Sequence, residues 1–172
     1  EATLAAVNER AAELGIKSVV LYSITGVTAA RTVDVLSGLR LLVVTRPTGY
    51  AAPNQQDFSP DNRAYVESKG GTVYTVTPVF GGLSNAMNKR FKTMALGEVV
   101  ANTLTLFGEG MRHALESLVT ATDGGLVAAG EPVIAMAAAE GGADTAVVCR
   151  PVNSLDFWDL RVSEIICKPR FL

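Results

Sequence analysis

The first 45 residues alternate twice between a helical pattern and a short buried strand, and this alternation is the strongest constraint on the fold. Apolar residues recur at helical spacing from Leu4 to Leu14, and Gly15 predicts the end of that helix. The next run, "KSVVLY", is rich in β-branched residues and does not alternate, which is typical of a strand buried on both faces. A helical pattern at residues 29–36 and the strand "RLLVVT" repeat the unit. Such units predict a parallel sheet with helices on both faces.

The rest of the chain extends the same α/β pattern and then changes character. Ser59 before Pro60 predicts a helix start, "TVYTV" a third strand, and residues 96–107 and 111–122 two further helices. The runs "PVIAMA", "TAVVCR" and "LRVSEIICK" predict three C-terminal strands. With right-handed crossovers, we expect one three-layer α/β/α domain over residues 1–172. Its doubly wound, mostly parallel sheet has strand order 3-2-1-4-5 and an antiparallel C-terminal edge.

Charge and hydropathy argue against several classes of partner. Lys and Arg number 15 against 17 Asp and Glu, a net charge of -2, whereas nucleic acids and anionic membranes both select an excess of Lys and Arg. We found no uninterrupted apolar window of about 18 residues, so the sequence predicts no membrane span. Cys149 and Cys167 each end an apolar run and are expected to be buried thiols, with cross-strand proximity left open. A reducing cytoplasm is the simplest location.

Two loops are expected to face one crevice at the switch point between the first and fourth strands. Open α/β sheets bind ligands there, beyond the carboxyl ends of the strands. The loop "SITGVT" follows the first strand and opens a helix, so its backbone N–H groups and hydroxyls could hold a phosphate or carboxylate, with Gly26 allowing close approach. The alternative is that Ser23 or Thr25 only caps the helix and Gly26 relieves a tight turn.

The second loop, residues 138–145, carries the stretch "GGADT" after the fourth strand. Asp144 and Thr145 are a second candidate pair of ligand-binding residues. The same stretch is equally well suited to a hairpin turn that joins the fourth and fifth strands.

Conventional catalytic residues are scarce. His113 is the only histidine and is expected on a helix surface, as are Glu98, Glu109 and Glu116. One histidine and two isolated cysteines are too few for a metal site made of nitrogen and sulfur ligands. Whether the protein is an enzyme is therefore left open.

Four separated blocks carry a family resemblance that covers nearly the whole chain: "ERAAELGIKSVVLYSITGVTAA", "LGEVVANTLTLFGEGMRHALES", "GGADTAVVCRPVNS" and "FWDLRVSEIICKPRF". The sequence resembles the stand-alone pyruvate kinase alpha/beta domain-like proteins. That family shares its fold with the regulatory C-terminal domain of pyruvate kinase but lacks the catalytic barrel. The resemblance therefore implies the fold without phosphoenolpyruvate chemistry.

The resemblance also implies a phosphorylated, flavin-like ligand such as FMN in the crevice. Carried over by motif, Ser23, Thr25, Gly26 and Thr28 would hold the phosphate, Thr45, Thr75 and Thr77 would line the crevice, and Gly142, Asp144 and Thr145 would close it. Arg46 stands where the family tends to carry a histidine, and its planar fork suits phosphate.

Three hypotheses follow from the sequence. The first is a cytoplasmic domain that binds a phosphorylated small molecule, FMN among the candidates. The second is a flavin-dependent enzyme that uses residues 46–59 as a lid, with Arg46, Tyr50 and Asp57 as its few chemical groups. The third is a structural or regulatory subunit that has lost its ligand, for which the alanine run at residues 137–139 is the main argument and homo-oligomerisation through apolar helices the expected behaviour.

Overall fold

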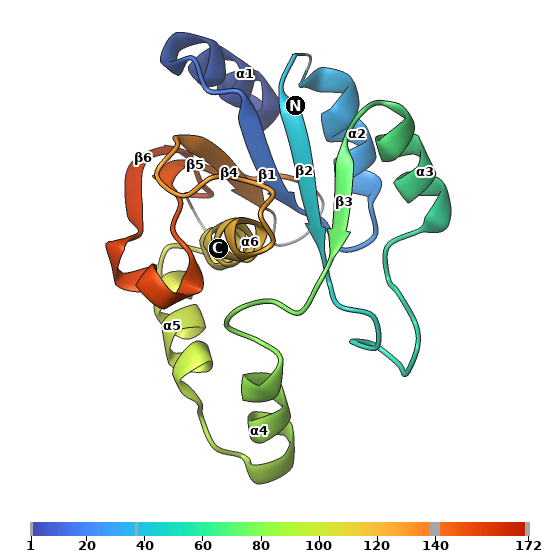
Figure 1. Cartoon of the computed structure of the whole chain (residues 1–172), viewed down its shortest axis with the longest axis vertical. Coiled ribbons are helices and arrows are strands. Elements are labelled where there is room, and N and C mark those ends of the chain that lie inside the picture. The colour runs from blue at the N-terminus through green and yellow to red at the C-terminus, as the bar shows by residue number, and fades with distance from the viewer. Residues whose placement is uncertain (1, 37, 138–141, 171–172) are drawn as a thin grey trace.

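The computed structural model describes residues 2–36, 38–137 and 142–170 and has the predicted mixed α/β architecture (Figure 1). In chain order the elements are α1 (Ala2–Leu14), β1 (Ser18–Tyr22), α2 (Val27–Val35), β2 (Arg40–Thr45), α3 (Pro60–Ser68), β3 (Thr72–Thr75), α4 (Leu83–Phe91), α5 (Leu96–Thr105), α6 (Glu109–Asp123), β4 (Val133–Ala137), β5 (Thr145–Arg150), the 3-10 helix η1 (Ser154–Asp159) and β6 (Arg161–Cys167).

The six strands form one sheet in the order β3-β2-β1-β4-β5-β6. β1 pairs in parallel with both β2 and β4, so Leu21 lies between Val43 and Met136. β4, β5 and β6 are antiparallel, because short connections join β4 to β5 and β5 to β6. The predicted order of the first five strands and the antiparallel edge are confirmed, and β6 extends that edge.

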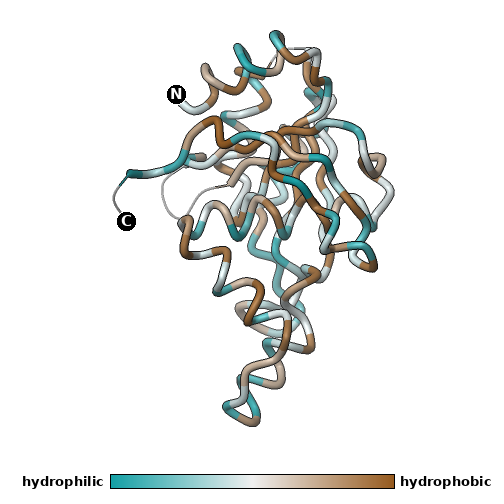
Figure 2. The backbone as a smooth tube through the Cα atoms, turned by 90° about the vertical axis from the view of Figure 1, so that its left-hand side faces the viewer, coloured by the Kyte–Doolittle hydropathy of each residue, from teal (hydrophilic) through white to brown (hydrophobic). Residues whose placement is uncertain are grey.

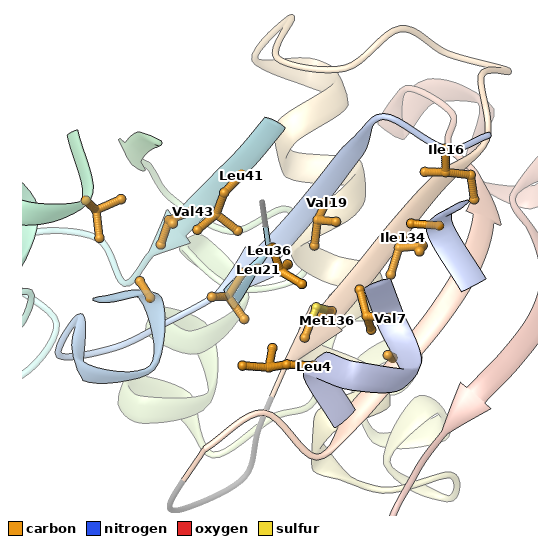
Figure 3. Packing of buried hydrophobic residues seen from close by; sticks show 14 of the residues in the cluster. Leu4, Val7, Ile16, Val19, Leu21, Leu36, Leu41, Val43, Ile134 and Met136 are labelled. Atoms are coloured by element: carbon orange, nitrogen blue, oxygen red, sulfur yellow. The ribbon is translucent and has the colours of Figure 1, made fainter. Parts of the chain in front are cut away.

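Helices cover both faces of the sheet, and alternate residues of each strand serve the two cores. Val19 and Leu21 of β1 face α1, α2 and α3, where they pack with Leu4 and Val7 (Figure 3). Val20 faces the other way, toward α6. Eleven of the fifteen residues of α6 are buried, because the sheet covers one side of this helix while α5 and η1 contact it elsewhere.

Residues 78–108 leave the body of the protein and form a protruding arm built from α4 and α5 (Figures 1 and 2). The weak apolar pattern at Leu83, Met87 and Phe91 does form a helix, but all three side chains are exposed. α4 has no buried residue at all, and α5 has only Ala101. The arm is therefore held mainly by its base.

Two sequence expectations about the remaining residues can be compared with the structure. Cys149 is buried as expected, opposite Val162, but Cys167 is only partly buried, so that expectation is wrong for Cys167. Cys167 lies opposite Ala146, so the thiols are at opposite ends of the β5–β6 ladder and are not neighbours. Among the described residues, no helix combines the length and the hydropathy needed to cross a membrane.

Candidate ligand-binding site

A cavity of about 320 Å³ lies beyond the carboxyl ends of β1 and β2, between the sheet, α6 and the base of the arm. Open α/β folds place ligands at this edge. Its polar and aromatic lining comes from five separate segments: Tyr22, Thr45, Arg46, Tyr50, Phe80, Asn85, Glu98, Asn102, Arg112, His113, Glu116, Ser117 and Thr120. Because α6 contributes five of these residues, this nearly buried helix is the rigid element that positions the cavity.

An aromatic pair forms one wall of the cavity. The rings of Tyr22 and His113 stack with their centroids 4.5 Å apart and their planes 9° from parallel. Burial, reinforced by the positive charges of Arg112 and Arg46, lowers the pKa of His113 to about 4. The imidazole is therefore neutral at pH 7 and can donate through one nitrogen and accept through the other. The expectation that His113 is a surface residue is wrong.

Two arginines line the same cavity from opposite segments. Arg46 follows β2, stacks 4.5 Å from the centre of the Tyr50 ring and lies 3.5 Å from the carboxylate of Asp57. Arg112 rises from α6, and one of its terminal nitrogens lies 3.4 Å from the Glu109 carboxylate. The Arg112 Nε is buried and has no hydrogen-bond partner within the described ranges. Both side chains are about one-third exposed, so they remain accessible to a ligand.

Glu116 is buried and lines the cavity, so the expectation that it lies on a helix surface is wrong. Its carboxylate accepts a hydrogen bond of 2.9 Å from the backbone N–H of Phe80, which ties the base of the arm to α6. Burial raises the pKa of this carboxyl, although that hydrogen bond and the charge of Arg112 oppose the rise. Glu98 has a related structural role, because it accepts from the N–H of Ala95 and closes the first turn of α5.

The predicted phosphate loop follows Tyr22 directly and is covered on one side. Gly26 has φ +90°, and a Cβ there would lie 2.6 Å from Asn62 Cβ and 2.7 Å from the Phe58 ring. The Thr25 carbonyl accepts from the Ser59 N–H and from the Asn62 side chain. The start of α3 therefore packs over the glycine.

No side chain caps α2, so the alternative in which Ser23 or Thr25 caps this helix is wrong. The turn alternative for Gly26 agrees with its positive φ. In the part of the chain that the structure describes, the hydroxyls of Ser23 and Thr28 make no hydrogen bond. The N-terminus of α2 thus keeps free N–H groups.

The three threonines predicted to line the crevice do not share one environment. Thr45 lines the cavity and donates to the hydroxyl of Thr75, which also accepts from Arg63 at 2.8 Å. Thr75 is thus engaged on the α3 side of the sheet. Thr77 lines an adjoining cavity that also contacts Tyr50 and Lys89.

The "GADT" stretch lies at the start of α6 and does not line the cavity. Thr145 donates to Asp144 at 2.8 Å, and a Cβ added to Gly110 would lie 2.2 Å from the Thr145 hydroxyl. Gly142 has φ +138° and nothing near its missing Cβ. The antiparallel pairing of Ala137 with Thr145 confirms the hairpin alternative. Residues 138–141, and with them two of the three alanines in the run, lie outside the described residues.

The segment predicted as a lid folds back on itself beside the cavity. The Gln56 side chain donates to the carbonyl of Arg46, and the N–H of Gly49 donates to the carbonyl of Gln55. Phe58, near its end, is buried against Gly26. The segment places Tyr50 in the lining of the cavity, and hydrogen bonds between its first and last residues hold it in this folded conformation.

A polar stripe along α6 is the signal that could have located the cavity. Arg112, His113, Glu116 and Thr120 recur at helical spacing on a helix that also carries an apolar face. A buried helix with such a stripe must face a cavity or a polar partner, because unpaired polar groups are costly to bury. Tyr22, the last residue of β1, carries no comparable signal.

Comparisons with known proteins show only a distant likeness of fold. No protein-family model matches the chain. A pyruvate kinase from Cryptosporidium parvum is similar in structure, with 15% sequence identity and a TM-score of 0.43 over 87% of this chain. The match covers 22% of that enzyme, so this chain spans about a fifth of its length.

Among the described residues, no cluster of His, Cys, Asp and Glu could hold a metal ion.

Proposed function

We propose that the protein binds a phosphorylated small molecule in the cavity, with Arg46 and Arg112 holding the phosphate. The observation that carries this proposal is the pair of guanidinium groups in one cavity, one of them with a buried Nε that has no partner among the described residues. Guanidinium forks match phosphate oxygens with two hydrogen bonds at a time. Each guanidinium has one carboxylate nearby, Asp57 for Arg46 and Glu109 for Arg112, and a phosphate would add further charge-assisted hydrogen bonds to both.

The remaining walls suit a planar organic group. Tyr22 and His113 are stacked, and Tyr50 lies between this cavity and the adjoining one. A neutral imidazole can hydrogen-bond to uncharged ring nitrogens and oxygens. FMN, which combines a phosphate with a planar ring, is the specific candidate that we propose. When bound, a flavin would supply hydride or electron transfer.

A thermal-shift panel tests this function, with FMN, riboflavin, AMP, fructose 1,6-bisphosphate and inorganic phosphate as probes. Binding at 100 times the dissociation constant stabilises a protein by about 2.7 kcal/mol, which moves the melting temperature measurably. We expect a shift with FMN and none with riboflavin. No shift with any probe would contradict the proposal and favour the structural-subunit hypothesis.

Arg112→Gln is expected to weaken the binding of the stabilising probe by roughly 10- to 100-fold, because a hydrogen bond to a charged group contributes about 1.5–3 kcal/mol. Isothermal titration measures the loss. Arg150→Gln is the matched control, since Arg150 is exposed at the end of β5, at the opposite edge of the sheet. Equal affinity of both variants would mean that the phosphate does not bind at Arg112.

The backbone N–H groups at the N-terminus of α2, which no side chain caps, support a second possible binding position for the phosphate. Thr28→Val removes a hydroxyl at nearly constant shape, and its effect on binding distinguishes the two possible phosphate positions. Loss of binding in this variant, with Arg112→Gln unaffected, would move the phosphate to the loop of residues 23–28. Bleaching of a bound flavin by NAD(P)H would favour the flavin-dependent enzyme over simple binding.

A further inference from the structure

The arm exposes many large apolar side chains. Together with η1 it carries ten large apolar side chains that are 42–96% exposed: Leu83, Met87, Phe91, Met94, Leu96, Val99, Leu106, Phe107, Leu155 and Trp158. If an aromatic side chain has roughly 150–250 Å² of surface and an aliphatic one somewhat less, these exposures amount to about 1,000 Å².

Five of these residues form two surfaces, one on α4 and one on η1, and the charged residues of these two helices differ in sign. The arm surface consists of Leu83, Met87 and Phe91, one face of α4, with the exposed cations Lys89, Arg90 and Lys92 beside it. In the described chain none of these three cations forms an ion pair. Residues 83–97 contain no acidic residue.

The base surface lies on η1, where Leu155 and Trp158 are 96% and 74% exposed. Asp156 and Asp159 alternate with them. Asp159 lies 4.0 Å from Arg161, and Arg150 and Arg161 line the same surface hollow as both carboxylates. Phe157 of the same segment packs edge-on against Phe80 at the foot of the arm. η1 itself thus contributes two carboxylates and no cation to the base surface, whereas α4 contributes two cations and no carboxylate to the arm surface.

From this complementarity we infer that the occupant is a second copy of the same chain. In the resulting two-fold dimer, the arm surface of each protomer lies on the base surface of its partner. A two-fold axis makes each contact occur twice, so both apolar surfaces of both chains are covered at once. The five residues of the two surfaces expose roughly 600 Å² of apolar side chain per protomer, so the two contacts together cover about 1,200 Å², the lower end of a standard protein interface. The acidic and basic residues lie around the apolar contacts and fix the pairing of arm with base.

Dimerisation would also hold one wall of the cavity. Asn85 of α4 and Glu98 and Asn102 of α5 line it, and within one chain α5 packs on α6 whereas α4 has no buried residue. A partner that clamps the arm would therefore fix the position of these residues relative to Arg112.

Sedimentation velocity of the full chain tests the dimer. The wild type is expected to sediment as a dimer, and Leu83→Ser and Leu155→Ser should each weaken association at least tenfold. Leu14→Ser is the control, because Leu14 is an exposed leucine on α1, away from the arm. A monomeric wild type would overturn the inference, and its co-sedimentation with vesicles of anionic lipid would point to a membrane surface instead. A dimer that is unaffected by either leucine variant would overturn it as well.

Charge reversal tests the pairing of arm with base. Lys89→Glu with Arg90→Glu, and separately Asp156→Lys with Asp159→Lys, should each give monomers, because like charges then face each other in both contacts. Mixing the two monomeric variants should restore a heterodimer in which every contact again joins opposite charges. This restoration also shows that both variants are folded. If both variants are monomeric and the mixture stays monomeric, the arm does not bind the base and the inference fails.

Discussion

Gly26→Ala is expected to lower the free energy of unfolding by about 3 kcal/mol, measured by urea denaturation. Two costs combine at this position. A residue with a Cβ loses roughly 1–2 kcal/mol in left-handed backbone, and φ at Gly26 is +90°. The new methyl group would also lie 2.7 Å from the buried Phe58 ring, and overpacking of that kind costs about 1–3 kcal/mol.

Gly70→Ala separates these two costs. Gly70 has nearly the same φ, +85°, but nothing lies within 4 Å of the Cβ that alanine would add. We expect this variant to lose only about 1 kcal/mol, the cost of the backbone conformation. Equal losses of unfolding free energy in the two variants would contradict the close packing of Phe58 against Gly26. The space beside Gly26 would then be open to a ligand.

The loop at Gly26 illustrates what the sequence could predict and what it could not. The position of the glycine after a buried strand predicted a loop at the ligand edge of the sheet, and the loop is there. The residues that cover it, Phe58 and Asn62, come from a segment without periodicity and from the next helix. Contacts between such distant segments leave no pattern in either one, so the covering of Gly26 was not predictable.

The same division holds for the rest of the fold and the candidate site. β1, β2 and β4 contain continuous apolar runs and β3 is a shorter run of Thr, Val and Tyr. These local patterns together with the handedness of crossovers were enough to predict the order of the first five strands. The cavity is different, because its lining depends on the arm, which folds over one face of α6. Polar residues of a helix are normally expected on its exposed side, and for that reason His113 and Glu116 were predicted at the surface.

The stability of the protein is expected to fall by about 2–3 kcal/mol between pH 7 and pH 4 because of His113 alone. In the native state the pKa of His113 is lowered to about 4, whereas the unfolded chain titrates near 6.5. Above pH 6.5 both states are neutral and the stability is complete. As the pH falls below 6.5 the unfolded state binds a proton that the folded state does not, so stability is lost progressively until pH 4.

His113→Phe is the variant that isolates this effect, since phenylalanine keeps a ring against Tyr22 but cannot titrate. His113 is the only histidine, so no other imidazole titrates in this range. Glu116 acts in the opposite sense: its raised pKa makes the folded state bind a proton first, so acidification through that range favours folding. Glu116 is present in both proteins, and its contribution largely cancels in their difference.

Urea denaturation at pH 7, 6, 5 and 4 should therefore show the variant losing less stability than the wild type, with most of the difference appearing below pH 6. Parallel pH profiles would mean that His113 is solvated in the folded protein and that the Tyr22–His113 wall of the cavity is not closed.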